Sequence, residues 1–173
     1  MRRYFNSPIQ YVVATLLCAA LPPAASAATT ELPAGPQVDA APCVAAAAAN
    51  DDERIIAACG ALVDNEKTSK PDRIKALIAR AGAYDRKDLI DRAIGDYEVA
   101  LRLDSTLADI FNARGELWRR KGDRPRALAD FGVAIKLNPQ HEAARANYKS
   151  LALELERLGA QMAIKNKSNP PLK

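Results

Sequence analysis

The stretch IKALIARAGAYDRKDLIDRAIGDYEVALRLDSTL, residues 74–107, is followed at once by ADIFNARGELWRRKGDRPRALADFGVAIKLNPQH, residues 108–141. Laid over each other without a gap, the two 34-residue stretches share 10 identical positions. These are Ala79/Ala113, Arg80/Arg114, Arg86/Arg120, Lys87/Lys121, Arg92/Arg126, Ala93/Ala127, Asp96/Asp130, Val99/Val133, Ala100/Ala134 and Leu103/Leu137. A fixed period of this size indicates a stacked helical array.

Large and small side chains in the second copy recur at intervals of three, four and seven residues, the spacing of one helix face. Two such sets occur: Phe111, Gly115 and Trp118, then Ala127, Phe131 and Ala134. The break between them contains Asp123, which is placed to cap the second helix. Since Gly115 and Ala127 lack bulk, the two helices can approach closely there, while larger side chains fill the gaps around them.

This series resembles the tetratricopeptide repeat. The second copy carries the family's pattern as Phe111, Gly115, Trp118, Ala127, Phe131, Ala134 and Pro139. The first copy carries Leu77, Ala81, Tyr84, Ala93, Tyr97 and Ala100, with Ser105 where the family has Pro. The resemblance implies an all-α fold, a right-handed array of antiparallel helix pairs with a C-terminal end helix.

Further helices are expected on both sides of the two copies. Residues 40–66 are interpreted as a degenerate first repeat of two helices that meet at Asn50-Asp51. The helix of the next repeat opens at Ser69, a good cap, followed by Pro71. An end helix is predicted over 139–158, with Gly159 as its stop, so that the helical domain spans 40–159. Residues 160–173 are predicted to be a disordered tail.

The N-terminal 27 residues have the pattern of a signal peptide. Arg2 and Arg3 give a positive start, Tyr11–Leu21 is a short apolar run, and Ala25–Ala27 ends in a small-x-small motif. We therefore expect cleavage after Ala27, a disordered linker over 28–39, and a periplasmic or secreted mature chain. The alternative is an uncleaved anchor, although the apolar run is short for a bilayer span.

Cys43 and Cys59 would be the two cysteines of that mature chain. They lie eight residues on either side of Asp51, so an antiparallel hairpin would bring them level, and an oxidising compartment favours a disulfide. One detail conflicts with this, because the repeat's close contact would place Ala47 opposite Cys59. Two buried free thiols are the alternative.

Catalytic, metal and nucleic-acid sites are not predicted. The formal charge of +4 falls to +2 without Arg2 and Arg3, and no basic stripe with aromatic residues occurs. The single histidine, His141, stands at a repeat boundary and is expected at the surface. Two cysteines and one distant histidine make no zinc set, and no Gly-rich phosphate loop is present. We therefore predict a non-enzymatic protein without a cofactor.

A binding surface is implied by the resemblance, since the first helix of each repeat in such arrays lines the concave side. Its outward residues are Lys75, Ile78, Gly82, Asp85 and Arg86 in one repeat and Asp109, Asn112, Glu116, Arg119 and Arg120 in the next. Such Asn, Arg and Lys side chains can hold a peptide backbone or a carboxylate. The Lys and Asn set that clamps a terminal carboxylate in some relatives is matched only in part, so that ligand is not predicted. A merely solvated charged face is the alternative.

The sequence therefore predicts an exported protein-interaction module with a protein or peptide partner. No nucleic acid partner and no membrane span in the mature chain are expected. The alternative function is structural, with the array taking part in self-association or envelope assembly through its exposed edge.

Overall fold

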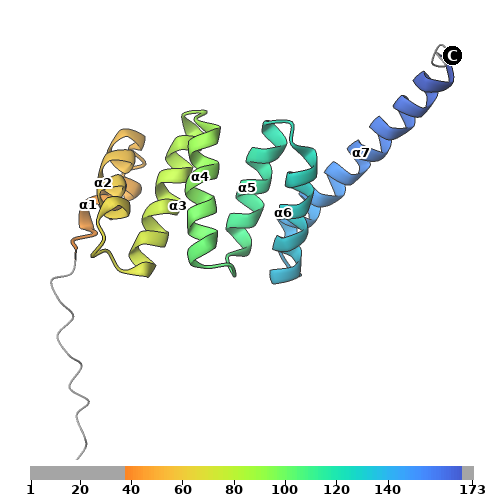
Figure 1. Ribbon diagram of the computed structural model, residues 1–173. Coiled ribbons are helices and arrows are strands. Elements are labelled where there is room, and N and C mark those ends of the chain that lie inside the picture. The colour runs from red at the N-terminus through yellow and green to blue at the C-terminus, as the bar shows by residue number, and fades with distance from the viewer. Residues whose placement is uncertain (1–37, 169–173) are drawn as a thin grey trace, which may run out of the picture. The chain divides into compact units, whose positions relative to one another are not determined.

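A computed structural model describes residues 38–168, and within this range the chain forms seven α-helices and no strand (Figure 1). The helices are α1 (Ala41–Ala48), α2 (Asp52–Asp64), α3 (Lys70–Arg86), α4 (Ile90–Leu103), α5 (Ala108–Arg120), α6 (Arg124–Leu137) and α7 (Glu142–Ser168). The predicted signal peptide 1–27, most of the linker 28–39 and residues 169–173 lie outside the described residues.

The first six helices form three antiparallel pairs, and each pair packs against the next in chain order (Figure 1). The turn inside each pair contains one residue with positive φ: Asn50 at 53°, Asp88 at 56° and Gly122 at 85°. A left-handed residue just after a helix ends it and reverses the chain within a few residues. The predicted all-α array of helix pairs with an end helix is confirmed.

Side-chain caps start three of the helices where the sequence places Asp or Ser. Asp51, Ser69 and Asp123 accept a hydrogen bond from the backbone N–H three residues later, at 3.1, 3.2 and 3.0 Å. These bonds satisfy donors that the first helical turn leaves without a partner. The caps predicted at Ser69 and Asp123 are both present.

The two helices of the second repeat approach each other closely at Gly115. A Cβ atom there would lie 2.7 Å from Cε1 of Phe131 and 3.3 Å from the carbonyl oxygen of Ala127. Phe131 and Ala127 are both fully buried, so neither can move aside into solvent. The predicted close approach of Gly115 and Ala127 is present, and the absence of a side chain at position 115 makes room for the Phe131 ring.

A bidentate ion pair joins the two helices of each clear repeat. Arg80 donates to both carboxylate oxygens of Asp96 at 2.8 Å, and Arg114 donates to those of Asp130 at 2.8 and 2.7 Å. Both aspartates are buried, and in each pair the hydrogen bond to the carboxylate raises the pKa of the arginine. Planar bidentate contacts fix geometry as well as charge, so they set the register of each helix pair.

A disulfide joins Cys43 and Cys59, whose sulfurs lie 2.06 Å apart and whose Cα atoms lie 4.7 Å apart. The expectation that Ala47 faces Cys59 is wrong. One repeat length before the end of α3 at Arg86 is position 52, and one repeat length before the start of α4 at Ile90 is position 56. Helix α1 ends at Ala48 and α2 begins at Asp52, so each boundary comes four residues earlier than the repeat predicts. Four residues are about one helical turn. Cys43 is therefore buried in the close-contact position, and Ala47 is exposed.

The predicted limits of the end helix are wrong at both ends. Pro139 lies in a turn before α7, which runs from Glu142 through Gly159 to Ser168. A glycine inside a helix costs only about 1 kcal/mol, and Gly159 is followed by helix-forming Ala, Gln and Met residues. A stronger stop comes later, because Pro170 disfavours helical backbone at the residue before it. The predicted tail 160–173 is thus helical up to Ser168.

The surface position expected for His141 is also wrong. Its side chain is 12% exposed, and Nδ1 lies 3.4 Å from the backbone nitrogen of Ala144 as an acceptor at the start of α7. Nε2 lies 3.1 Å from Oδ1 of Asp109 but outside hydrogen-bond geometry. His141 therefore helps to begin the end helix.

We predict that the disulfide stabilises the N-terminal helix pair. Helix α1 has eight residues and buries only Cys43 and Ala46, so little besides the bridge holds it. Changing both Cys43 and Cys59 to Ser should lower the free energy of unfolding by about 3 kcal/mol in oxidising buffer. Denaturant titration with and without reductant measures this, since the variant should resemble the reduced wild type. Two titratable thiols in the native, unreduced protein would contradict the prediction.

Enlarging the close contact should wedge the second helix pair apart. Ala127→Leu places a large side chain beside Gly115 and should cost roughly 1–3 kcal/mol by overpacking. Ala129→Leu on the same helix is the matched control, because Ala129 is exposed, and it should change stability by less than about 0.5 kcal/mol. Equal denaturation midpoints for the two variants would show that the faces of α6 are assigned wrongly.

Candidate protein-interaction surface

The predicted binding residues lie on the first helices of the pairs, α3 and α5, and α7 follows them in the position of the next first helix. We call the surface formed by α3, α5 and α7 the first-helix face. The structure divides the predicted residues by exposure. Lys75, Arg86, Asp109, Glu116 and Arg120 are exposed; Ile78, Gly82, Asp85 and Arg119 are partly buried; and Asn112 is buried.

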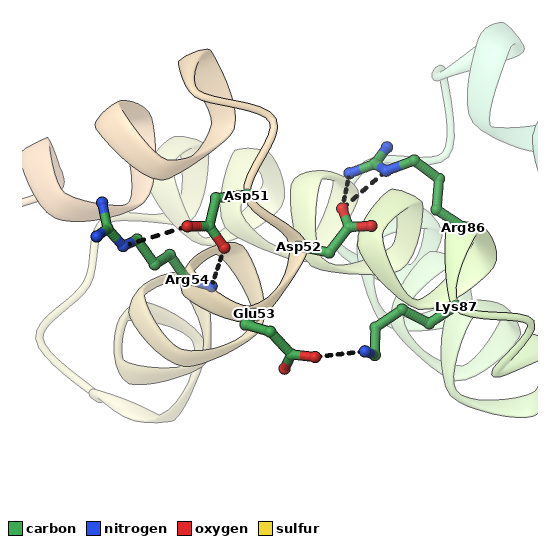
Figure 2. Close-up of polar contacts among 6 residues, drawn as sticks. All are labelled: Asp51, Asp52, Glu53, Arg54, Arg86 and Lys87. Atoms are coloured by element: carbon green, nitrogen blue, oxygen red, sulfur yellow. Dashed lines mark hydrogen bonds and ion pairs between the residues drawn. The ribbon is translucent and has the colours of Figure 1, made fainter.

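Several of the predicted cations bind acidic residues of the preceding helix pair. Figure 2 shows Arg86 donating to Oδ1 of Asp52 through Nε at 2.8 Å and Nη2 at 2.5 Å, and Lys87 paired with Glu53. These partners are 34 residues apart, one repeat length. The hydrogen bond from Lys87 to Glu53 raises the pKa of the lysine. Arg86 therefore joins neighbouring pairs.

The next junction repeats this arrangement. Arg120 binds Asp85, and it also donates to Oδ1 of Asp88 at 2.6 Å, while Lys121 binds Asp91. The pKa of Arg120 is raised by its hydrogen bond to Asp85. Asp85 and Arg120, both predicted to contact a partner, are thus paired with each other. We refer to these contacts and those of Arg86 and Lys87 as the inter-repeat ion pairs.

At the last junction the charges are reversed. Glu154 of α7 accepts from Nε of Arg124 at 2.7 Å and from Nη2 of Arg119 at 3.3 Å. The hydrogen bond from Arg124 lowers the pKa of Glu154. Here the earlier pair supplies the bases and the later helix supplies the acid. Arg119 is therefore also engaged within the chain.

Polar side chains of α5 and α7 form a small network on the first-helix face. Asn147 donates through Nδ2 to Oδ1 of Asn112 at 3.0 Å and to Oε1 of Glu116 at 2.8 Å. Asn112 in turn donates to Oε1 of Glu116 at 3.0 Å. Asn112 is 8% exposed, whereas Glu116 faces solvent. The network holds an exposed carboxylate in place through a buried amide.

Two hollows open between first helices. One, of about 380 Å³, lies between α5 and α7 and is lined by Arg119, Ser150, Leu153, Glu154 and Arg157. The other, of about 210 Å³, lies between the first hairpin and α3, with Lys75 at its wall and the apolar side chains of Val44, Leu62 and Ala79 around it. Both are large enough to take a side chain of a bound peptide.

The site includes residues that the sequence analysis missed. Asn147, Ser150, Glu154 and Arg157 come from α7, which the sequence predicts as an end helix but not as part of the binding surface. The inter-repeat ion pairs were also missed, although their signal was present. Arg86/Arg120 and Lys87/Lys121 are identical in both copies, and acids stand one repeat before Arg86 and Lys87.

Within residues 38–168 no group of three or more His, Cys, Asp and Glu side chains is arranged to hold a metal ion. The helices of this range are also too short or too polar to cross a membrane.

Comparison with known proteins supports a tetratricopeptide-repeat-like fold. No protein-family model matches the chain. The Arabidopsis thaliana tetratricopeptide repeat domain-containing protein PYG7, chloroplastic, is 26% identical over 85 residues, which is 49% of this chain. The chain spans only 28% of the length of that relative.

Solved structures of tetratricopeptide repeat (TPR) domains share the fold. The first TPR of Spaghetti (RPAP3), bound to the HSP90 peptide SRMEEVD, gives a TM-score of 0.60 at 18% identity, over 70% of this chain and 99% of that one. The second TPR domain of human RPAP3, in complex with the HSP70 peptide SGPTIEEVD, gives 0.56 at 20% identity, over 64% and 88%. The Arabidopsis OM64 TPR domain gives 0.57 at 20% identity, over 64% and 88%.

We predict that Arg120 contributes to stability rather than only to binding. Arg120→Ala removes the contacts to Asp85 and Asp88 and should cost about 0.5–1 kcal/mol, because the arginine is partly exposed. The loss should shrink at high salt, which screens exposed ion pairs. Lys136→Ala, at an exposed position on α6, is the control. Denaturation midpoints at two salt concentrations test this, and identical behaviour of the two variants would contradict it.

Proposed function

We propose that this chain is a non-enzymatic protein-interaction module that binds an extended segment of a partner protein on the first-helix face. The observation that carries this proposal is the network of Asn112, Glu116 and Asn147 beside the hollow of about 380 Å³ between α5 and α7. An extended peptide needs polar partners for its backbone and recesses for its side chains, and this surface offers both.

The similar structures support the proposal. Two TPR domains with this fold are described with short peptides bound, one from HSP90 and one from HSP70. The fold can therefore present a peptide-binding surface, although fold alone does not specify a ligand.

We further propose that the protein works outside the cytoplasm, in the periplasm or as a secreted protein. The positively charged start, the short apolar run and the Ala25–Ala27 motif support export. The Cys43–Cys59 disulfide supports an oxidising compartment. N-terminal sequencing of exported protein should begin at Ala28, and a sequence that begins at Met1 would contradict cleavage.

Self-association through α7 is the second candidate function. Leu151, Leu155, Leu158 and Met162 follow one another at intervals of four, three and four residues, the spacing of a helix–helix seam. Leu151 is fully buried, whereas Met162 is 63% exposed, so the seam continues beyond the part that the array covers. A second copy of the chain would supply an identical α7 in a symmetric contact.

Site-specific photo-crosslinking in the host cell separates the two candidates. A photoreactive residue would replace Leu153 at the hollow, Met162 on α7, or Lys136 on α6 as the control; all three are exposed. We expect Leu153 to give an adduct with another protein, and Lys136 to give none. An adduct of two copies of the chain from Met162 alone would favour self-association. Equal yields at the three positions would contradict a defined binding surface.

A further inference from the structure

The charges of the first-helix face are mostly neutralised within the chain. Asp85 is paired with Arg120, Arg86 with Asp52, and Arg119 with Glu154. Glu116 differs from these residues. Over residues 38–164, whose side chains the structure describes, it has no cationic side chain within ion-pair distance, and its hydrogen bonds come from the neutral amides of Asn112 and Asn147. The exposed carboxylate therefore keeps its negative charge without a counter-ion from the described part of the chain.

The usual partners of Glu116 on its own helix are engaged elsewhere. A glutamate in a helix ordinarily pairs with a base three or four residues later, and Arg119 and Arg120 occupy those positions. Arg119 instead reaches Ser150 and Glu154 on α7, while Arg120 reaches Asp85 and Asp88 at the preceding pair. The inter-repeat contacts thus remove both bases from Glu116.

The remaining neighbours do not supply a positive charge. Arg145 and Lys149 of α7 line another hollow, together with Ile135 and Tyr148, between α6 and α7. Tyr97 lies near Glu116, but a phenol is either neutral or negative and cannot supply a positive charge. Burial raises its pKa to about 12, so it is neutral at physiological pH. Arg157 of α7 lines the hollow of about 380 Å³ but forms no ion pair with Glu116, so the described side chains supply no counter-ion to this carboxylate.

The carboxylate is also held ready to bind. Asn112 and Asn147 both donate to Oε1, and Asn112 is itself buried and fixed by Asn147. The second oxygen, Oε2, accepts no hydrogen bond from the residues that the structure describes. Holding a group in its binding position lowers the entropy lost on association. A cation that approaches Oε2 would form a charge-assisted hydrogen bond, the strong kind.

We infer that the partner segment presents a basic side chain, lysine or arginine, to Glu116. This inference rests on the proposed function. The inferred segment differs from the acidic HSP90 and HSP70 peptides of the similar structures. An acidic segment would bring a second carboxylate next to Glu116, and the amides of Asn112 and Asn147 already donate to Glu116. The chain therefore selects a basic segment on this part of the face.

Selection from a phage-displayed library of random nine-residue peptides tests the inference without knowledge of the natural ligand. The purified chain would be immobilised beside its Glu116→Gln variant, which keeps an acceptor oxygen but loses the charge. Glu66→Gln, at an exposed position in the turn between α2 and α3, is the control. We expect peptides enriched by the wild type and by Glu66→Gln to share a lysine or arginine. These peptides should bind Glu116→Gln about tenfold more weakly than they bind the wild type. Their affinity for the wild type should fall as the salt concentration rises.

The outcomes separate this inference from the proposed function. Enrichment of peptides without a shared basic residue, or equal affinity for the wild type and Glu116→Gln, would overturn the inference and leave a peptide-binding module. If the wild type enriches no peptide sequence above background, the proposed peptide binding fails and the inference fails with it. Equal thermal stability of the two Gln variants would show that any loss of affinity arises from the missing charge.

Discussion

The close approach of the two helices within each pair is the contact on which the rest of the array depends. In the second repeat it is achieved by Gly115, whose missing side chain lets α5 approach the Phe131 ring and the backbone carbonyl of Ala127 on α6. In the N-terminal pair the corresponding place holds the Cys43–Cys59 disulfide. Helix α1 is short and rich in alanine, so it has little apolar area to bury, and a covalent link replaces the aromatic packing of the other pairs.

The contacts between pairs use charge in addition to apolar packing, and their order limits how the array can continue. Acids of one pair meet bases of the next at two successive junctions, with partners about one repeat apart. At the last junction Arg119 and Arg124 meet Glu154 instead. Glu154 stands one repeat after Arg120, where a further repeat like the first two would have an arginine. That arginine would face Arg119 and Arg124 and so bring like charges together. The reversal therefore specifies α7, rather than a further copy, as the neighbour of α6.

The sequence predicted the contacts that follow from the repeat itself. The 34-residue period gave the helix pairs, and the spacing of Gly115, Ala127 and Phe131 gave their facing surfaces. It failed where a contact depends on the position of one element against another. The register of α1 could not be read by counting back 34 residues, because its turn comes four residues early. The roles of Asp85 and Arg120 were missed because an exposed charge on a helix looks the same in sequence whether it binds a neighbour or a ligand.

The same distinction decides which residues of the surface carry information about a partner. Arg86, Arg119 and Arg120 would suggest a basic surface suited to an acidic ligand if they were counted from the sequence alone. Each is neutralised by a carboxylate of a neighbouring element, so its charge acts mainly within the array. Glu116 stands among them with only amide donors. The Glu116 carboxylate therefore offers a partner a negative charge, opposite in sign to the arginines around it. Specificity in a repeat array follows from the charges that remain after the repeats have bound one another.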